Sequence, residues 1–168
     1  MFERYTEPAR RAIFFAHALA VLSDSDSIDS VDLLRGLLFE DATRVQTLFQ
    51  LRDFFPIYKG CPRKHTKLPE RKDGPPLTKD SKMILAWTAF EANRLRDYWI
   101  DTEHLLLGLL HMPTSAGGAY LLRTGLTLNA ARQTVKENSP SRPAYGDIPL
   151  IWRFKKPFLW IDSLWIGR

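Results

Sequence analysis

The sequence of 168 residues has a single cysteine, Cys61, so the chain cannot form an intramolecular disulfide. A lone cysteine is typical of proteins from a reducing compartment, and we expect a cytoplasmic location. No apolar run approaches the roughly 18 residues of a membrane-spanning helix. The apolar stretch after Arg11 resembles a signal peptide, but Glu3 and Glu7 lie in its would-be basic region. A cleaved leader is therefore the less favoured interpretation.

Motifs for phosphate binding, metal binding and catalysis are also missing. The sequence has no G-x-x-x-x-G-K-[ST] loop, which predicts that it holds no P-loop ATPase site. Cys61 and His65 supply only two candidate metal ligands. His104 and His111 are too far apart in sequence for an HExxH-type zinc site. We therefore expect no enzymatic activity, no metal and no cofactor.

The chain does contain an internal repeat with an offset of 72 positions. Residues 6–38 align without a gap on residues 78–110, and nine of the 33 aligned positions are identical, where chance gives about two. The identical pairs are Thr6/Thr78, Ala20/Ala92, Ile28/Ile100, Asp29/Asp101, Leu33/Leu105, Leu34/Leu106, Gly36/Gly108, Leu37/Leu109 and Leu38/Leu110. This pattern predicts a duplicated helical unit, hereafter the first and second copies.

Each copy is predicted to be a helix, a turn and a second helix. Apolar side chains recur at three- and four-residue steps along both first helices. Thr6 and Thr78 fit the N-caps of these helices, and Asp29 and Asp101 fit the starts of the second helices. The leucines shared by the two second helices predict a buried face on each, worth about 1.5 to 3 kcal/mol per side chain before entropy is subtracted.

Gly36 and Gly108 interrupt these leucine-rich helices at equivalent positions. A glycine inside a helix costs roughly 1 kcal/mol relative to alanine, so its presence in both copies indicates a close approach of another helix. We expect the two copies to meet there.

The two copies differ beyond their leucine-rich helices. The second copy continues with a short helix that ends at Gly125 and a further helix capped by Thr127. In the first copy, Pro56, Pro62 and Pro69 fall where the matching helix should be. We therefore assign a domain over residues 1–137 with about seven or eight helices: repeat one at 1–55, a basic linker at 56–77 and repeat two at 78–137.

The segments "MFERYTEPARRAIFFA", "IDTEHLLLGLL" and "GLTLNAARQTV" closely resemble the double-repeat N-terminal domain of the Clp unfoldases of the ClpA and ClpC type. The resemblance covers about residues 1–137. It implies an all-α, pseudo-twofold module that in this family sits on an ATPase ring and receives substrates and adaptor proteins. Without a ring motif, the sequence resembles a free-standing receiving module, an adaptor or regulator of Clp-dependent proteolysis. The expected partners are Clp substrates, adaptors or a Clp ring.

The resemblance also implies a binding site at the helix starts. In the ClpC branch, the Glu of each TEH segment and the Thr near the start of each repeat belong to a pocket for phosphorylated arginine, and the resemblance implies such a pocket here. Thr78, Glu103 and His104 match this pattern in the second copy, and Thr6 matches it in the first. A carboxylate suits a guanidinium, and helix-start amides suit a phosphate. The alternative interpretation of Glu103 is a first-turn acid that stabilises its helix by about 0.3 to 1 kcal/mol.

The first copy departs from this pattern. Val31 holds the place of the Glu, and Asp32 stands where the family has His. Asp29 and Asp32 are the possible first-copy counterparts, and we expect one of the two pockets to be inactive or altered.

The last residues, 138–168, lie outside the resemblance. A linker is followed by an apolar tail, in which alternating apolar residues up to Trp160 predict a short β-hairpin with one apolar face. The tail residues expected to interact are Trp152, Phe154, Phe158, Trp160 and Trp165. A lone hairpin is marginal in water, so this tail needs a partner surface. The alternatives are the helical body, another protein or a second protomer in a homodimer, and a membrane surface.

A nucleic-acid binder is the rival class of function. It rests on the basic residues of the linker, namely Lys59, Arg63, Lys64, Lys67, Arg71 and Lys72. The formal net charge of +5 is modest, so we favour a protein or peptide partner over nucleic acid.

Overall fold

The structure, a computed structural model, describes residues 2–49 and 74–138. These ranges contain six helices: α1 (Glu7–Leu22), α2 (Ser30–Phe49), α4 (Lys79–Arg94), α5 (Thr102–Leu110), α6 (Ala116–Arg123) and α7 (Leu128–Asn138). The predicted all-α fold is confirmed. The rest of the basic linker and the tail with its predicted hairpin lie outside the described residues, so their structure and docking stay predictions.

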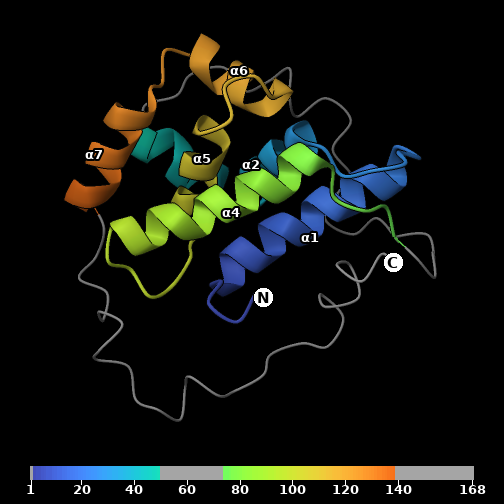
Figure 1. Cartoon of the computed structure of the whole chain (residues 1–168), viewed down its shortest axis with the longest axis horizontal. Coiled ribbons are helices and arrows are strands. Elements are labelled where there is room, and N and C mark those ends of the chain that lie inside the picture. The colour runs from blue at the N-terminus through green and yellow to red at the C-terminus, as the bar shows by residue number, and fades with distance from the viewer. Residues whose placement is uncertain (1, 50–73, 139–168) are drawn as a thin grey trace.

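The first helices of the two copies begin as the sequence predicts. The Thr6 hydroxyl oxygen accepts the N–H of Ala9 at 3.4 Å, and that of Thr78 accepts the N–H of Ser81 at 3.1 Å. Both threonines have extended backbone and act as N-caps. In Figure 1, α1 and α4 lie toward the viewer, and the leucine-bearing helices α2 and α5 lie behind them. The shared leucines are all buried, as predicted: Leu33, Leu34, Leu37, Leu38, Leu105, Leu106, Leu109 and Leu110.

Helix α2 covers the stretch that the second copy divides between α5 and α6. Its backbone leaves the helical region at Asp41, where φ is −138° and ψ is 39°. The equivalent position in the second copy is Pro113, between the end of α5 and the start of α6. The two copies thus share one path, with a break in α2 where the second copy has a complete turn.

The two helical glycines lie at contacts within each copy. A Cβ atom on Gly36 would lie 2.6 Å from the backbone nitrogen of Ala16 in α1, and one on Gly108 would lie 2.6 Å from the backbone oxygen of Ile84 in α4. The expectation of a close approach is confirmed. The expectation that the copies meet at these glycines is wrong, because each glycine lets the second helix of a copy pack on the first helix of that same copy.

Two short backbone exchanges join the copies at the entries to their helices. The N–H of Thr6 donates to Ile100 at 2.9 Å, and the N–H of Thr78 donates to Ile28 at 3.0 Å. Because each pair joins the entry to one copy's first helix with the entry to the other copy's second helix, the two exchanges are related by the repeat offset. Buried side chains of both copies form one hydrophobic core. None of the helices in the described ranges is long and apolar enough to cross a membrane.

Candidate functional site at the helix starts

The predicted site residues lie at the starts of α5 and α2, where the copies exchange backbone hydrogen bonds. Thr6 lies at the start of α5, and its hydroxyl donates to Asp101 Oδ1 at 2.7 Å. Thr78 lies at the start of α2, where its N–H donates to Ile28. The sequence pattern groups Thr78 with Glu103 because both belong to the second copy. The structure corrects this grouping, because the first-helix entry of each copy crosses over to the other copy.

Arg44 occupies the centre of the α5-start site, which we define as Thr6, Asp41, Arg44, Asp101, Thr102 and Glu103. Its guanidinium lies 3.0 Å from Asp101 Oδ2 and 2.9 Å from Glu103 Oε2. Asp41 completes the site, since its Oδ2 lies 3.9 Å from Arg44 and accepts the Thr102 hydroxyl at 2.6 Å. Three carboxylates against one guanidinium leave the site with a formal charge of −2.

The residues of the α5-start site differ in their exposure to solvent. The side chain of Glu103 is 2% exposed and that of Arg44 is 33% exposed, so a guanidinium edge faces solvent above a buried carboxylate. Burial by itself would raise the pKa of Asp101. The hydrogen bonds from Thr6, from the backbone N–H of Thr102 and from Arg44 outweigh burial, so the pKa of Asp101 lies below its ordinary value. The site therefore binds a guanidinium already, namely that of the chain itself.

His104 serves the helix start rather than an open surface. It is fully buried, its Nδ1 accepts the N–H of Asp101 at 3.0 Å, and its Nε2 lies 3.1 Å from Asp97 Oδ2. With the Asp101 side chain bonded to the first turn, this pair forms a capping box.

Asp29 and Asp32 build the same arrangement at α2. Asp29 Oδ1 accepts the N–H groups of Val31 and Asp32 at 2.7 and 2.9 Å, and Asp32 Oδ2 accepts the N–H of Asp29 at 3.1 Å. Burial is the main reason that the pKa of Asp32 lies above its ordinary value. The position of the family histidine is thus a capping position in both copies of this chain.

The start of α2 is covered by α6 instead of by an arginine. Gly117 of α6 donates its N–H to the Ser30 hydroxyl at 3.0 Å, and a Cβ on Gly117 would lie 2.9 Å from the Ser30 carbonyl carbon. The repeat offset places Ala116 where the first copy has Arg44. One helix start is therefore covered by an arginine and the other by close backbone packing.

Comparison with known proteins agrees with this double-repeat geometry. No family model matches the sequence. The chain is 27% identical over 137 residues to the negative regulator of genetic competence ClpC/MecB of Bacillus subtilis (strain 168), which covers 80% of this chain and 17% of that protein. It also resembles the N-terminal domain of the chaperone ClpD from Arabidopsis thaliana, with a TM-score of 0.62 and 21% identity over 83% of this chain and 100% of that domain. The fold is that of a Clp N-terminal domain.

The chain also matches a protein of Mycobacterium tuberculosis. The uncharacterized protein Rv2667 of Mycobacterium tuberculosis (strain ATCC 25618 / H37Rv) is 32% identical over 120 residues, which is 69% of this chain and 46% of that protein. The chain therefore spans between a sixth and a half of the length of these curated relatives.

One cluster of this Clp N-terminal domain was not anticipated from sequence. Glu91 is fully buried in α4 and accepts two hydrogen bonds from Arg132, at 2.8 and 2.7 Å. Its Oε1 also lies 2.7 Å from His111 Nε2, and the His111 ring stacks on Trp87 at 4.3 Å. The available signal was an acidic residue within the apolar stripe of α4. In residues 2–49 and 74–138, no group of three His, Cys, Asp or Glu side chains is arranged to hold a metal ion.

Proposed function

We propose that this chain is a non-catalytic module that binds segments of other proteins, as its resemblance to the receiving domain of Clp unfoldases implies. The observation that carries the proposal is the similarity to ClpC/MecB over 137 residues, together with the Clp N-terminal fold. The polar side chains at the helix starts support it, because Asp29, Asp101 and His104 are engaged in caps rather than in a catalytic arrangement.

The direct test uses an unfolded protein as the probe. Fluorescently labelled lysozyme, reduced and carbamidomethylated so that it cannot refold, is titrated with the full chain and followed by anisotropy. Saturable binding to the unfolded probe, with none to native lysozyme, is the expected result. A chain that binds neither unfolded lysozyme nor a phosphoarginine peptide would contradict the proposed function.

A finer part of the proposal concerns arginine at the α5-start site. The contacts of Arg44 with Asp101 and Glu103 support a guanidinium-binding role. The guanidinium of a substrate's phosphoarginine competes for these carboxylates, and the displaced Arg44 pairs with the phosphate. This exchange matters because the formal charge of −2 would otherwise repel a phosphate group. Charge-assisted pairs of this kind contribute about 1.5 to 3 kcal/mol each.

Two substitutions test this exchange with peptides that differ only in arginine or phosphoarginine. Glu103→Gln removes the buried carboxylate and is expected to weaken phosphoarginine binding about tenfold or more. Arg44→Ala frees the carboxylates but removes the phosphate partner, so it should favour arginine over phosphoarginine. If Arg44→Ala leaves the preference of the unaltered chain intact, Arg44 does not contact the phosphate and the exchange is wrong.

A further inference from the structure

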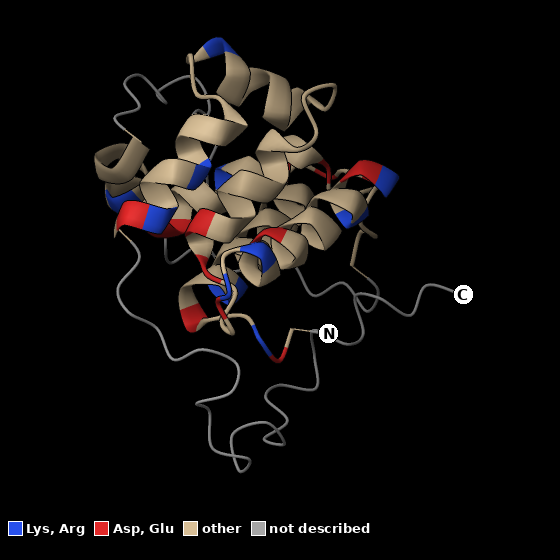
Figure 2. Ribbon diagram, turned by 60° about the vertical axis from the view of Figure 1, so that its left-hand side comes forward, with Lys and Arg blue, Asp and Glu red and all other residues tan. Residues whose placement is uncertain are grey.

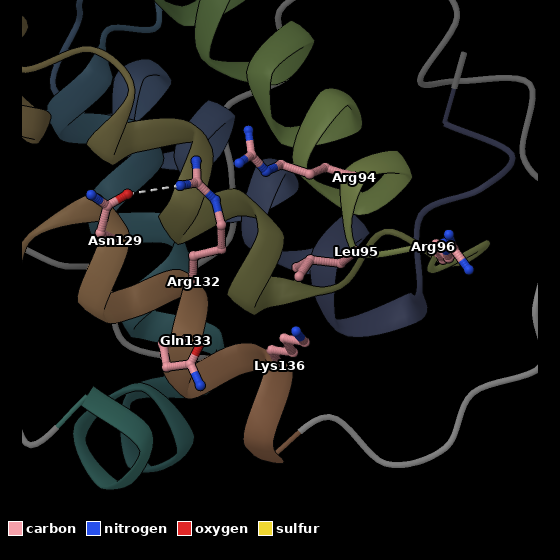
Figure 3. Close-up of a pocket in the computed structure, with 7 residues that line it drawn as sticks. All are labelled: Arg94, Leu95, Arg96, Asn129, Arg132, Gln133 and Lys136. Atoms are coloured by element: carbon pink, nitrogen blue, oxygen red, sulfur yellow. Dashed lines mark hydrogen bonds between the residues drawn. The ribbon is translucent and has the colours of Figure 1, made fainter.

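A pocket of about 710 Å³ lies between the end of α4 and the outer side of α7. Four of its lining side chains are cationic, Arg94, Arg96, Arg132 and Lys136, and none is acidic. Figure 3 shows them rising from α4, from the turn after it and from α7, with Asn129 and Arg96 at opposite sides of the pocket. This volume lies within the range of about 300 to 1,000 Å³ that is usual for ligand sites.

Three of these four cations form no ion pair within the part of the chain that the structure describes. Arg132 is paired with the buried Glu91 through two hydrogen bonds, so the charge of its guanidinium is neutralised. Arg94, Arg96 and Lys136 are exposed, and none of them forms an ion pair with any residue in the described ranges. Two acidic residues are sequence neighbours of these cations. Asp97 follows Arg96 and has its carboxylate bonded to His104, and Glu137 follows Lys136 and accepts a hydrogen bond from Gln133 at 2.6 Å. Among the described residues, the lining of the pocket therefore carries an excess of positive charge, which attracts anions.

The repeat shows that the fold does not require this charge. In the first copy, Leu22, Ser23 and Asp24 take the places of Arg94, Leu95 and Arg96. The turn itself is retained, because Asp24 and Arg96 both have positive φ, 51° and 63°. Glycine would be the easiest residue at such a position. The basic side chains thus stand on an unchanged turn in the second copy only.

We propose that this pocket binds an acidic segment of a protein partner, whose Asp or Glu side chains pair with Arg94, Arg96 and Lys136. Leu95 gives the pocket an apolar surface. Asn129 Oδ1 accepts from Arg132 and Gln133 Nε2 donates to Glu137, which leaves the Asn129 amide N–H groups and the Gln133 amide oxygen for a peptide backbone. A nucleic acid needs a run of basic residues that follows successive phosphates. Figure 2 shows basic and acidic positions interspersed over the described helices, without such a run. The inference rests on the proposed function, since it names one class of protein segment that the module receives.

The test uses the full chain and a fluorescein-labelled oligoglutamate peptide, with an oligoglutamine peptide of equal length as reference. We expect binding of oligoglutamate only, weakened when NaCl is raised from about 50 to about 200 mM. Arg94→Glu and Lys136→Glu should each weaken binding about tenfold. Lys79→Glu is the matched control, because it makes the same charge change about 22 Å away at the other end of α4 and should leave binding within about twofold. Circular dichroism checks that each variant is folded.

Other outcomes overturn the proposal. Equal binding of oligoglutamine, or equal losses for Lys79→Glu and Arg94→Glu, removes the pocket as the site. If a single-stranded DNA oligonucleotide binds more tightly than oligoglutamate and loses affinity in the Arg94→Glu chain, the surface is a nucleic-acid site instead. Unfolded lysozyme separates the two proposals. A chain that binds it but ignores oligoglutamate contradicts the pocket alone, whereas a chain that binds neither lysozyme nor phosphoarginine contradicts the proposed function.

Discussion

At the scale of single residues, the polar contacts of this domain divide into local caps and long-range pairs. Thr6, Thr78, Asp29 and Asp101 are predictable as caps because a cap depends on side chains and amides within three residues of one another. The pairing of Arg44 with Glu103 joins residues 59 positions apart, and no local sequence pattern predicts it. Sequence reasoning therefore found the helix starts and missed the side chain that covers one of them.

Glu91 gives a residue-scale prediction. Its carboxylate accepts hydrogen bonds from Arg132 and lies 2.7 Å from His111, so Glu91→Gln leaves the partly buried Arg132 guanidinium without a counter-charge. We expect the free energy of unfolding at neutral pH to fall by about 2 to 4 kcal/mol. Urea denaturation followed by circular dichroism measures this change. Glu137→Gln, on the exposed side of α7, is the matched control and should change stability by no more than about 0.5 kcal/mol.

The pH dependence of stability depends on the same group. Burial would raise the pKa of Glu91, but the hydrogen bonds from Arg132 and His111 outweigh burial and leave the pKa below the ordinary 4.5. Because the folded pKa is depressed, this stabilisation is fully present above the unfolded value and is lost as pH falls through the folded one. The urea concentration at the unfolding midpoint of the unaltered chain should therefore decrease as the pH is lowered below roughly 4.5. The same decrease should be smaller for the Glu91→Gln chain. Parallel curves for the two chains would show that Glu91 does not contribute.

At the scale of helices, the glycine positions were predictable and their partners were not. The recurrence of glycine at the same place in both leucine-rich helices indicated a close approach, which the structure confirms. Periodicity cannot tell which helix approaches, because α1 and the second copy are both apolar neighbours of α2. The assignment of that contact to the interface between copies is wrong for this reason.

Gly36→Ala tests the close approach. In an unobstructed helix this change stabilises by about 0.5 to 1 kcal/mol, whereas here the new Cβ meets the backbone of Ala12 and Ala16, which cannot rotate away. We expect a loss of about 1 to 3 kcal/mol in the free energy of unfolding. Gln133→Ala, at an exposed position of α7, gives the reference for a harmless helical alanine. A stabilised Gly36→Ala chain would falsify the close packing of α2 on α1.

The helix starts offer a gain of function. Val31 occupies the position of the family Glu at the start of α2, with Thr78 at the same helix start. If the α5-start site binds phosphoarginine, Val31→Glu should supply the carboxylate that the first copy lacks. We expect a peptide with two phosphoarginines to bind more tightly to the Val31→Glu chain than to the unaltered chain, since two weak sites act through effective concentration. Val31→Gln, which has the same size but no charge, is the control, and equal affinities for both variants would contradict the carboxylate's role.

At the scale of the whole molecule, the two copies form one folding unit. They exchange backbone hydrogen bonds at Ile28 and Ile100, and their buried side chains join in a single core. The sequence revealed the duplication because both copies keep the same buried positions. It did not reveal the crossing of the copies, because the backbone hydrogen bonds from Thr6 to Ile100 and from Thr78 to Ile28 join residues far apart in sequence and require no particular side chains.

This shared core predicts that damage in one copy is felt in the other. Gly36→Ala alters only the first copy, and Gly108→Ala, whose Cβ would meet Thr88 and Ile84, alters only the second. Because unfolding either copy exposes the leucines of the other, amide hydrogen exchange should accelerate by the same factor in α1 and α4 for each variant. Mass spectrometry of peptides from these helices measures it. If Gly36→Ala accelerates hydrogen exchange in α1 and leaves α4 unchanged, the copies unfold independently, and the shared core does not couple their stability.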